Sequence, residues 1–192
     1  MGRIIVIENI TLDGVMQAPA APDEDTRGDF RHGGWGAPYF DEVAMREMGE
    51  GMAQGGPLLF GRVTYQQFEG FWPKQTDGNP FTPVLNAATK YVASTTLTGP
   101  LSWENSVLVG SGEVAGLKER EPRDIGVLGS GELVQTLLRH DLVDQFVLSI
   151  HPVVLGEGTR LFRDGAQLAT FELVKSVPTT TGVIIATYDR AR

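Results

Sequence analysis

Residues Val127-Leu128-Gly129-Ser130-Gly131-Glu132 decide the fold, because a strand, a tight turn and the start of a helix follow one another there without a break. We predict a short strand over Asp124–Leu128, and Glu132–His140 carries apolar side chains at helical spacing. A turn of this kind aims unpaired backbone N–H groups and the positive end of the helix dipole at one point. Glycine lets a phosphate approach that backbone, so the stretch predicts an anion site at the end of a strand.

Two other strands of the expected sheet end in a similar way. The stretch Leu59-Phe60-Gly61-Arg62-Val63-Thr64 passes from a strand into a helix through a glycine, and the strand Lys90–Ser94 runs into Thr95 and Thr96. Two or three such turns on one edge of a sheet form a cradle for a dinucleotide. Arg62 adds the fixed cation that an acidic protein needs to hold a phosphate. Each motif alone has a simpler reading, in which the glycines are ordinary turn residues and Arg62 is a solvated charge.

The rest of the chain alternates short β-branched runs with helical patterns, which is typical of an α/β sheet. The continuous apolar run Ile4–Ile7 suits a strand that is buried on both faces. The other elements that we predict are strands at Arg3–Asn9, Pro57–Phe60 and Ser106–Val109, helices at Tyr39–Ala53, Arg62–Phe68 and Glu113–Arg120, and late strands at Asp144–Leu155, Thr170–Val177 and Thr181–Tyr188. The late strands have no helix between them, so an antiparallel edge is expected to complete the sheet.

The composition excludes several classes of protein. With 192 residues, 41% hydrophobic and 21% charged, the chain can bury a core, and it is neither disordered nor fibrous. Its net charge of −8 at pH 7 provides no global field for a nucleic acid or a membrane surface, so we expect neither as a partner. The absence of cysteine excludes disulfides and thiolate sites, and the three histidines have no metal-ligand spacing, so no metal is expected. We see no signal peptide and no apolar run near the ~20 residues of a membrane span, and we expect a cytoplasmic protein.

Five segments follow one another along nearly the whole chain: Leu12-Asp13-Gly14, Gly61-Arg62-Val63-Thr64, Lys90-Tyr91-Val92-Ala93-Ser94-Thr95, Gly129-Ser130-Gly131-Glu132, and residues 152–162, Pro-Val-Val-Leu-Gly-Glu-Gly-Thr-Arg-Leu-Phe. In this order they resemble the dihydrofolate reductase-like superfamily, closest to the reductase domain of the bifunctional riboflavin-biosynthesis deaminase-reductase. The last segment is the most specific. The resemblance implies an α/β, three-layer dihydrofolate reductase-like fold with a mostly parallel central sheet and an antiparallel C-terminal edge. We expect a single domain over residues 1–192, without the deaminase domain of the bifunctional enzyme.

The same resemblance implies NADPH as the cofactor. In that superfamily the Gly-Arg-x-Thr segment and the Ser/Thr pair that ends the next strand hold the cofactor's phosphates, and the late glycine turn lies against the pyrophosphate and the nicotinamide ribose. Carried over to this chain, the cofactor-binding residues are Gly61, Arg62, Thr64, Ser94, Thr95, Gly129, Ser130, Gly131 and Glu132. Ser130 departs from the pattern, because dihydrofolate reductases usually carry a second glycine there.

The substrate side is predicted under the long loop of residues 17–38, which is rich in Pro and Gly. Asp41 follows Trp35 at nearly the spacing of the carboxylate that binds the pterin in dihydrofolate reductases. The alternative for Asp41 is an acid that is stabilised by the helix dipole. Trp35 is predicted to stack on a flat heterocycle and His32 to move a proton, although a loop histidine is often merely solvated. Together with Asp13, these residues are expected to bound the substrate pocket.

The resemblance implies an oxidoreductase that moves hydride from NADPH to a small-molecule substrate, a planar polar heterocycle or a ribosylaminopyrimidine of riboflavin biosynthesis. The sequence shows no obvious anchor for a substrate phosphate. Two alternatives stay open: a dihydrofolate or pteridine reductase, and a nucleotide-binding dimeric module that kept the fold without the chemistry. We further expect a homodimer through the strand segment around Phe146 to Leu155, because an exposed apolar edge would otherwise pair with other chains.

Overall fold

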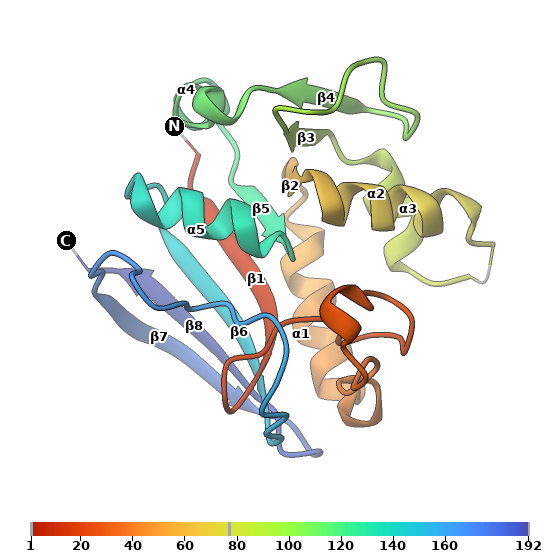
Figure 1. Cartoon of the computed structure of the whole chain (residues 1–192), viewed down its shortest axis with the longest axis vertical. Helices are drawn as coiled ribbons and strands as arrows, with labels where there is room; N and C mark the ends of the chain where they lie inside the picture. Colours follow the sequence, from red (N-terminus) through yellow and green to blue (C-terminus); the bar gives the residue numbers. More distant parts are fainter. Residues whose placement is uncertain (1, 77, 192) are drawn as a thin grey trace.

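The computed structural model describes residues 2–76 and 78–191, which form an eight-stranded sheet of order β4-β3-β2-β5-β1-β6-β8-β7 (Figure 1). The strands are β1 (Ile4–Thr11), β2 (Leu58–Gly61), β3 (Lys90–Ala93), β4 (Ser106–Val109), β5 (Ile125–Leu128), β6 (Gln145–His151), β7 (Phe171–Pro178) and β8 (Ile184–Arg190). The pairs from β4 through β6 are parallel, and β8 runs antiparallel to both β6 and β7. The mostly parallel sheet with an antiparallel C-terminal edge is therefore confirmed.

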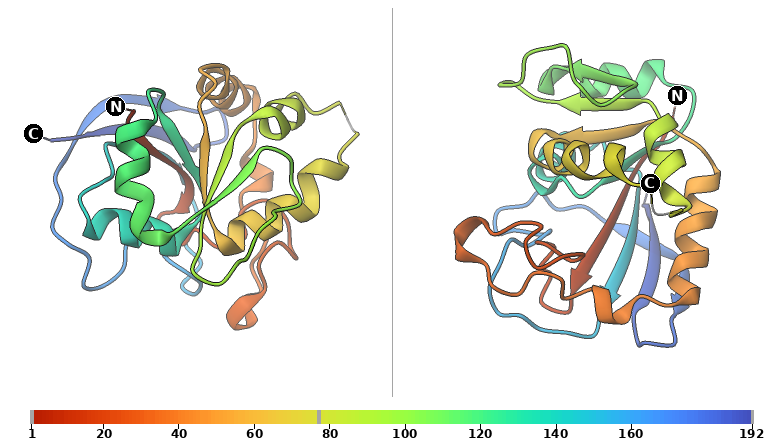
Figure 2. Two further views of the ribbon diagram at one scale, coloured as in Figure 1. Left: turned by 90° about the horizontal axis from the view of Figure 1, so that it is seen from above. Right: turned by 90° about the vertical axis from the view of Figure 1, so that its right-hand side faces the viewer.

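Helices cover both faces of the sheet, as the two further views show (Figure 2). The helices are α1 (Glu42–Ala53), α2 (Arg62–Phe71), α3 (Phe81–Ala87), α4 (Val114–Arg120) and α5 (Gly131–Arg139), with short 3-10 turns at residues 27–29, 37–39, 72–74 and 111–113. One apolar core packs beneath α4 and α5, and a second packs beneath α1, α2 and α3. None of the described helices is long and apolar enough to cross a membrane.

The alternation of side chains across each strand separates these two cores. In β2, Leu59 points into the core under α4 and α5, whereas its neighbour Phe60 points into the core under α2 and α3. In β3, Ala93 and Val92 divide in the same way. Both side chains of each pair are buried, so these short apolar runs have the doubly covered environment that a parallel sheet requires.

Two predicted elements are longer than the observed ones. The helix predicted from Tyr39 begins at Glu42, because Asp41 caps its N-terminus and a separate 3-10 turn containing Pro38 precedes it. The strand predicted over Asp144–Leu155 ends at His151, directly before Pro152, which has no N–H to donate to a ladder.

The predicted edge strand lies inside the sheet, which corrects part of the homodimer prediction. Strand β6 pairs with β1 on one side and with β8 on the other, so the segment around Phe146 is not free to pair with a second chain. The edges of the described sheet are β4 and β7. On β7, the side chains of Leu173 and Val174 are more than half exposed.

Lys90 is a buried charge that the strand pattern did not reveal. Its side chain is fully buried, and Nζ donates hydrogen bonds to the carbonyl oxygens of Leu85, Asn86 and Ala88 at 2.7 to 2.9 Å. Nζ also lies 4.5 Å from the centre of the Trp103 ring. The ammonium therefore closes the C-terminal end of α3, where the last carbonyl groups of a helix lack partners. Burial lowers the pKa of Lys90 from 10.5 to about 8.

Replacement of Lys90 by methionine is expected to destabilise the fold. The variant Lys90→Met keeps the length of the side chain but leaves three carbonyl groups without their donor, and hydrogen bonds to a charged group contribute about 1.5 to 3 kcal/mol each before any compensation. Urea unfolding should show a loss of about 2 kcal/mol or more. Lys74→Met, at an exposed lysine, is the matched control. A variant as stable as the wild type would show that Lys90 does not hold α3.

The homodimer stays a prediction, and we now place its contact on the β7 edge instead of β6. An exposed edge strand with apolar side chains is a pairing surface that a monomer rarely leaves open. Light scattering at micromolar concentration should give twice the mass of the chain, and Leu173→Glu should reduce it toward one chain. A single-chain mass for the wild type would contradict the prediction.

Candidate functional site

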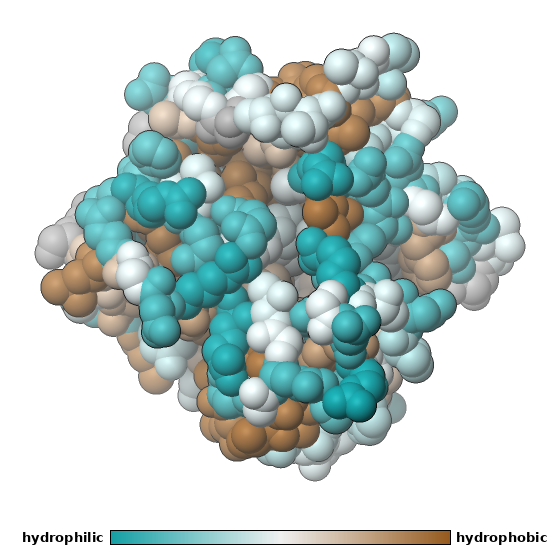
Figure 3. Space-filling model, viewed as in Figure 1, coloured by the Kyte–Doolittle hydropathy of each residue, from teal (hydrophilic) through white to brown (hydrophobic). Residues whose placement is uncertain are grey.

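A cavity of about 640 Å³ opens at the carboxyl ends of β1, β2, β3 and β5. The space-filling view shows it as a central hollow whose rim is hydrophilic and in which hydrophobic residues are visible (Figure 3). Ligands of open α/β sheets bind at this edge, because the turns that follow the strands meet there. The walls come from β1, the loop after it, α1, α2 and the turn before α5.

Two helices begin at this cavity without a side-chain cap. Gly61 is the N-cap of α2 and Ser130 is the N-cap of α5, and neither helix has a side-chain hydrogen bond at its cap position. The first N–H groups of a helix have no partner within the helix, and the helix dipole makes this end positive. Both helix starts can therefore bind an anion such as a phosphate group.

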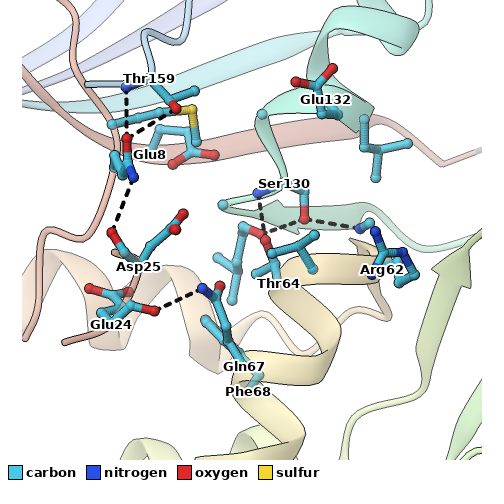
Figure 4. Close-up of a pocket in the computed structure, with 18 of the residues that line it drawn as sticks. Glu8, Glu24, Asp25, Arg62, Thr64, Gln67, Phe68, Ser130, Glu132 and Thr159 are labelled. Atoms are coloured by element: carbon cyan, nitrogen blue, oxygen red, sulfur yellow. Dashed lines mark hydrogen bonds between the residues drawn. The ribbon is translucent and has the colours of Figure 1, made fainter. Parts of the chain in front are cut away.

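Ser130 joins these two helix starts. Its Oγ accepts a hydrogen bond from the N–H of Gly61 at 3.0 Å and donates one to the carbonyl of Leu128 at 3.1 Å. Its own N–H donates to Oγ1 of Thr64 at 2.9 Å, so bonds run in both directions between the turns (Figure 4). Ser130 and Thr64 are both buried, at 8% and 9% exposure. The geometry explains the departure from the dihydrofolate reductase pattern, because a second glycine would supply no hydroxyl for this link.

The late glycine turn has a left-handed backbone conformation, in which another group can approach the main chain closely. Gly129 has φ +57° and Ser130 has φ +66°, both in the left-handed region that favours glycine. A Cβ at Gly129 would lie 3.1 to 3.2 Å from the side chain of Thr64, and a Cβ at Gly131 would lie 2.8 Å from Sδ of Met16. The turn is therefore packed closely against Thr64 and Met16, and these neighbouring side chains leave no space for a side chain at either glycine.

Cationic and hydroxyl groups surround the same end of the cavity. Arg62 makes a hydrogen bond to Gln66 and has no carboxylate partner within the described residues, whereas Arg163 pairs with Glu132 at 2.6 Å. Ser94 Oγ accepts hydrogen bonds from two backbone N–H groups of its own turn, and its O–H hydrogen is not used in them. The guanidinium of Arg62 is thus a cation available to an anionic ligand.

The structure brings the predicted cofactor-binding residues to one place. All nine of them line the cavity: Gly61, Arg62, Thr64, Ser94, Thr95, Gly129, Ser130, Gly131 and Glu132. Their roles toward NADPH stay predictions.

The four residues predicted on the substrate side do not line this cavity, and that part of the prediction is corrected. Asp41 is the N-cap of α1, with Oδ1 accepting from the N–H of Ala44 and Oδ2 accepting from Thr180. These hydrogen bonds, that of the Thr180 side chain above all, lower its pKa. The alternative reading of Asp41 as an acid at a helix start is the one that the structure shows.

The other three residues hold the long loop in place. Trp35 is buried, and its Nε1 donates to the carbonyl of Gln17 at 2.7 Å. Asp13 accepts hydrogen bonds from Thr11 and from the backbone of residues 155 and 156, and these bonds, led by that of Thr11, lower its pKa to about 2. His32 is half exposed, 3.3 Å from a carboxylate oxygen of Glu157. A pattern of residue types placed these side chains in a loop, but it did not show which way each would point.

The opposite end of the cavity is acidic, and the sequence analysis missed it. Figure 4 shows Glu8, Glu24 and Asp25 on one side of the cavity, across from Thr64 and Arg62. Burial raises the pKa of Glu8 well above 4.5, and it also raises the pKa of Glu24. Asp25 pairs with Arg27, whose hydrogen bond lowers its pKa. A carboxylate inside the apolar run of the first strand was the signal that could have found Glu8.

Apolar and aromatic side chains complete the wall between the two ends. They are Met48 and Met52 of α1, Phe68 of α2, and Trp72, Phe81 and Leu85 beyond it. Such a lining suits a flat ring, which can lie against aromatic and thioether groups.

Comparison with known proteins identifies the family. Residues 3–185 match the RibD C-terminal domain family. The chain belongs to this family. It is 32% identical to the uncharacterized protein YyaP of Bacillus subtilis (strain 168) over 137 residues, which are 68% of this chain and 72% of that protein.

Solved structures share the fold at low sequence identity. A putative riboflavin biosynthesis protein from Shewanella sp. PV-4 superposes with a TM-score of 0.71 at 24% identity, with 99% of each chain covered. A dihydrofolate reductase from Enterococcus faecalis, complexed with NADP(H) and RAB-propyl, superposes with a TM-score of 0.64 at 14% identity, covering 100% of this chain and 98% of that one. These likenesses confirm the predicted dihydrofolate reductase-like fold.

Two substitutions at Ser130 should separate its hydroxyl from its backbone conformation. Ser130→Ala keeps the left-handed strain and loses two hydrogen bonds, and each such bond contributes about 0.5 to 1.5 kcal/mol. Ser130→Gly loses the same bonds but relieves the strain, which costs of order 1 to 3 kcal/mol. Urea unfolding should therefore place Ser130→Gly close to the wild type, and both of them above Ser130→Ala. An alanine variant as stable as the wild type would show that the link contributes nothing.

Proposed function

We propose that this protein is an NADPH-dependent reductase that transfers hydride to a C=N or C=O bond of a planar, polar small molecule. The observation that carries the proposal is the pair of uncapped helix starts, joined through Ser130 and Thr64, beside the unpaired cation Arg62. An acidic protein that binds a phosphorylated cofactor must hold it by such a local site. NADPH supplies the hydride when bound.

Different residues of this chain are suited to bind the cofactor and to orient the substrate. The N–H groups at the starts of α2 and α5 are suited to the pyrophosphate, and Arg62, Ser94 and Thr95 to the additional phosphate that distinguishes NADPH from NADH. The apolar wall formed by Met48, Met52 and Phe68 excludes water and presents a flat surface to a heterocycle.

Membership of the RibD C-terminal domain family favours a ribosylaminopyrimidine of riboflavin biosynthesis as the substrate. A solved structure of the same fold, at 13% identity and a TM-score of 0.65, is described as a pyrimidine reductase-like protein from Corynebacterium diphtheriae. The cations Arg27 and Arg163, which line the cavity, are each paired with a carboxylate, so a phosphate on the substrate would compete with Asp25 or Glu132 for them.

Cofactor titration tests the proposal. Calorimetry should show that the wild type binds NADPH more tightly than NADH, and that Arg62→Ala weakens NADPH binding while it leaves NADH nearly unchanged. A charge-assisted contact of about 1.5 to 3 kcal/mol corresponds to roughly tenfold to a hundredfold in affinity. Arg120→Ala, at an exposed arginine of α4, is the control that keeps the net charge equal. Equal binding of both cofactors, unaffected by Arg62→Ala, would overturn the proposal.

The substrate class is tested by following NADPH oxidation with two compounds. Turnover of a phosphoribosylaminopyrimidine supports the riboflavin-type reaction, and turnover of dihydrofolate alone favours the pteridine reductase instead. Tight NADPH binding with no oxidation by either compound would favour the nucleotide-binding module without chemistry.

A further inference from the structure

Glu8 lies on the face of its strand that otherwise carries core side chains. In β1 the residues Ile4, Val6, Glu8 and Ile10 share one face of the central sheet, and the three apolar members of this set belong to the core under α5. Glu8 is only 5% exposed. A carboxyl group at such a position costs several kcal/mol unless it is neutral or paired, so a stable core alone gives no reason for it.

The Glu8 carboxyl group has an oxygen atom without a partner. Its Oε1 is buried and accepts or donates no hydrogen bond within the described residues, yet the side chain lines the cavity. Buried polar atoms nearly always find a partner in a folded protein. An unpaired carboxyl oxygen at the wall of a cavity therefore points to a ligand that completes it.

Burial and the charges around the cavity raise the pKa of this carboxyl group. The charged side chains that line the cavity besides Glu8 are Glu24, Asp25 and Arg27 of the long loop, Arg62 of α2, Glu132 of α5, and Arg163. Arg27 and Arg163 are paired with Asp25 and Glu132, and Arg62 lies among the residues of the phosphate end. Burial is the larger cause and the charge of Glu24 the smaller cause of the raised pKa of Glu8.

We propose that Glu8 is the catalytic acid of this site: it carries a proton into the reaction and donates it to the heteroatom of the substrate's double bond as the adjacent carbon is reduced. This inference rests on the proposed function, and it replaces Asp41 and His32 as the source of the proton. Neither of those residues lines the cavity.

The step balances with the cofactor already proposed. The carbon of the C=N or C=O bond gains the hydride, and the π electron pair moves onto the nitrogen or oxygen. The O–H bond of Glu8 breaks, and a new N–H or O–H bond forms on that atom. Glu8 is left as a carboxylate and takes its next proton from water. One molecule of NADPH is oxidised to NADP⁺ for each double bond reduced.

The protonation of Glu8 can be measured without any substrate. In protein labelled with ¹³C at the glutamate side-chain carboxyl, one signal should keep the position of a protonated acid at neutral pH. That signal should disappear in Glu8→Gln and persist in Glu172→Gln, a control at an exposed glutamate of β7. If every glutamate of the wild type is ionised at neutral pH, the proposal is overturned.

The pH dependence of unfolding gives a second readout. A folded-state pKa above the unfolded value of 4.5 means that the folded protein binds more protons above this pH, so Glu8 lowers stability as the pH rises. The urea midpoint of Glu8→Gln should therefore rise relative to the wild type between acidic and neutral pH. A difference that does not change with pH would contradict a proton held at Glu8.

A variant at Glu24 tests the protonation of Glu8 even if Glu8→Gln does not fold. Glu24→Gln leaves Glu8 in place but removes the like charge, so the ¹³C signal of Glu8 should titrate at a lower pH than in the wild type. An unchanged titration would overturn the role given to Glu24.

Single-turnover measurements then test the chemistry with whichever of the two compounds above oxidises NADPH. Glu8→Gln should slow the hydride step by about a hundredfold or more and leave the Kd for NADPH unchanged. A wild-type rate in Glu8→Gln would refute the inference and leave the proposed function intact. A wild type that does not bind NADPH, in contrast, would refute the proposed function. The ¹³C titration would still decide in that case whether Glu8 holds a proton.

Discussion

The hydrogen bonds of Ser130 are the constraint on which the candidate site depends. The starts of α2 and α5 belong to segments far apart in the sequence, because Ser130 is 69 positions beyond Gly61. Parallel strands bring their turns to one edge of a sheet, but they do not fix how the turns face each other. The reciprocal bonds between Ser130 and the Gly61–Thr64 segment fix this, and they leave both helix dipoles directed at the same cavity. A left-handed backbone at a residue with a side chain is the cost of this arrangement.

A second set of polar contacts determines the shape of the opposite wall. The side-chain amide of Gln17 donates to the carbonyls of Asp25 and Arg27 and accepts from Thr159. This one amide therefore joins the loop after β1 to the segment after β6. Asp13 makes the corresponding connection to Gly156. The two segments of the resemblance that lie farthest apart, 12–14 and 152–162, are therefore in contact in the fold. The contacts between these two segments hold in place the loop that carries Glu24 and Asp25.

The two ends of the cavity differ in how far the sequence could predict them. The phosphate end follows from contiguous patterns, because a strand, a glycine and a helix start stand next to one another at Gly61 and at Gly129. The other end depends on where a long loop folds back, and a list of ionisable residues in that loop does not contain this information. Trp35 and Asp13 are residue types that suit a substrate site, but in the fold their polar atoms form hydrogen bonds with backbone groups. Glu8 was overlooked because it stands inside a strand, although counting every second residue from Ile4 places it among core positions.

Net charge gives little indication of what the cavity binds. The chain carries −8 at pH 7, yet one end of its cavity presents two positive helix ends and Arg62, and the other presents Glu8 and Glu24. A ligand that satisfies both ends must be anionic where it meets the helix starts and must accept a proton where it meets Glu8. A phosphorylated cofactor beside a substrate with a basic nitrogen or a carbonyl oxygen has this polarity, and a purely anionic ligand does not. The raised pKa of Glu8, which burial causes first and the charge of Glu24 second, suits this reaction. An ionised Glu8 would repel the electron density that hydride brings to the adjacent double bond, whereas a neutral carboxyl group can give its proton to the atom that receives this density.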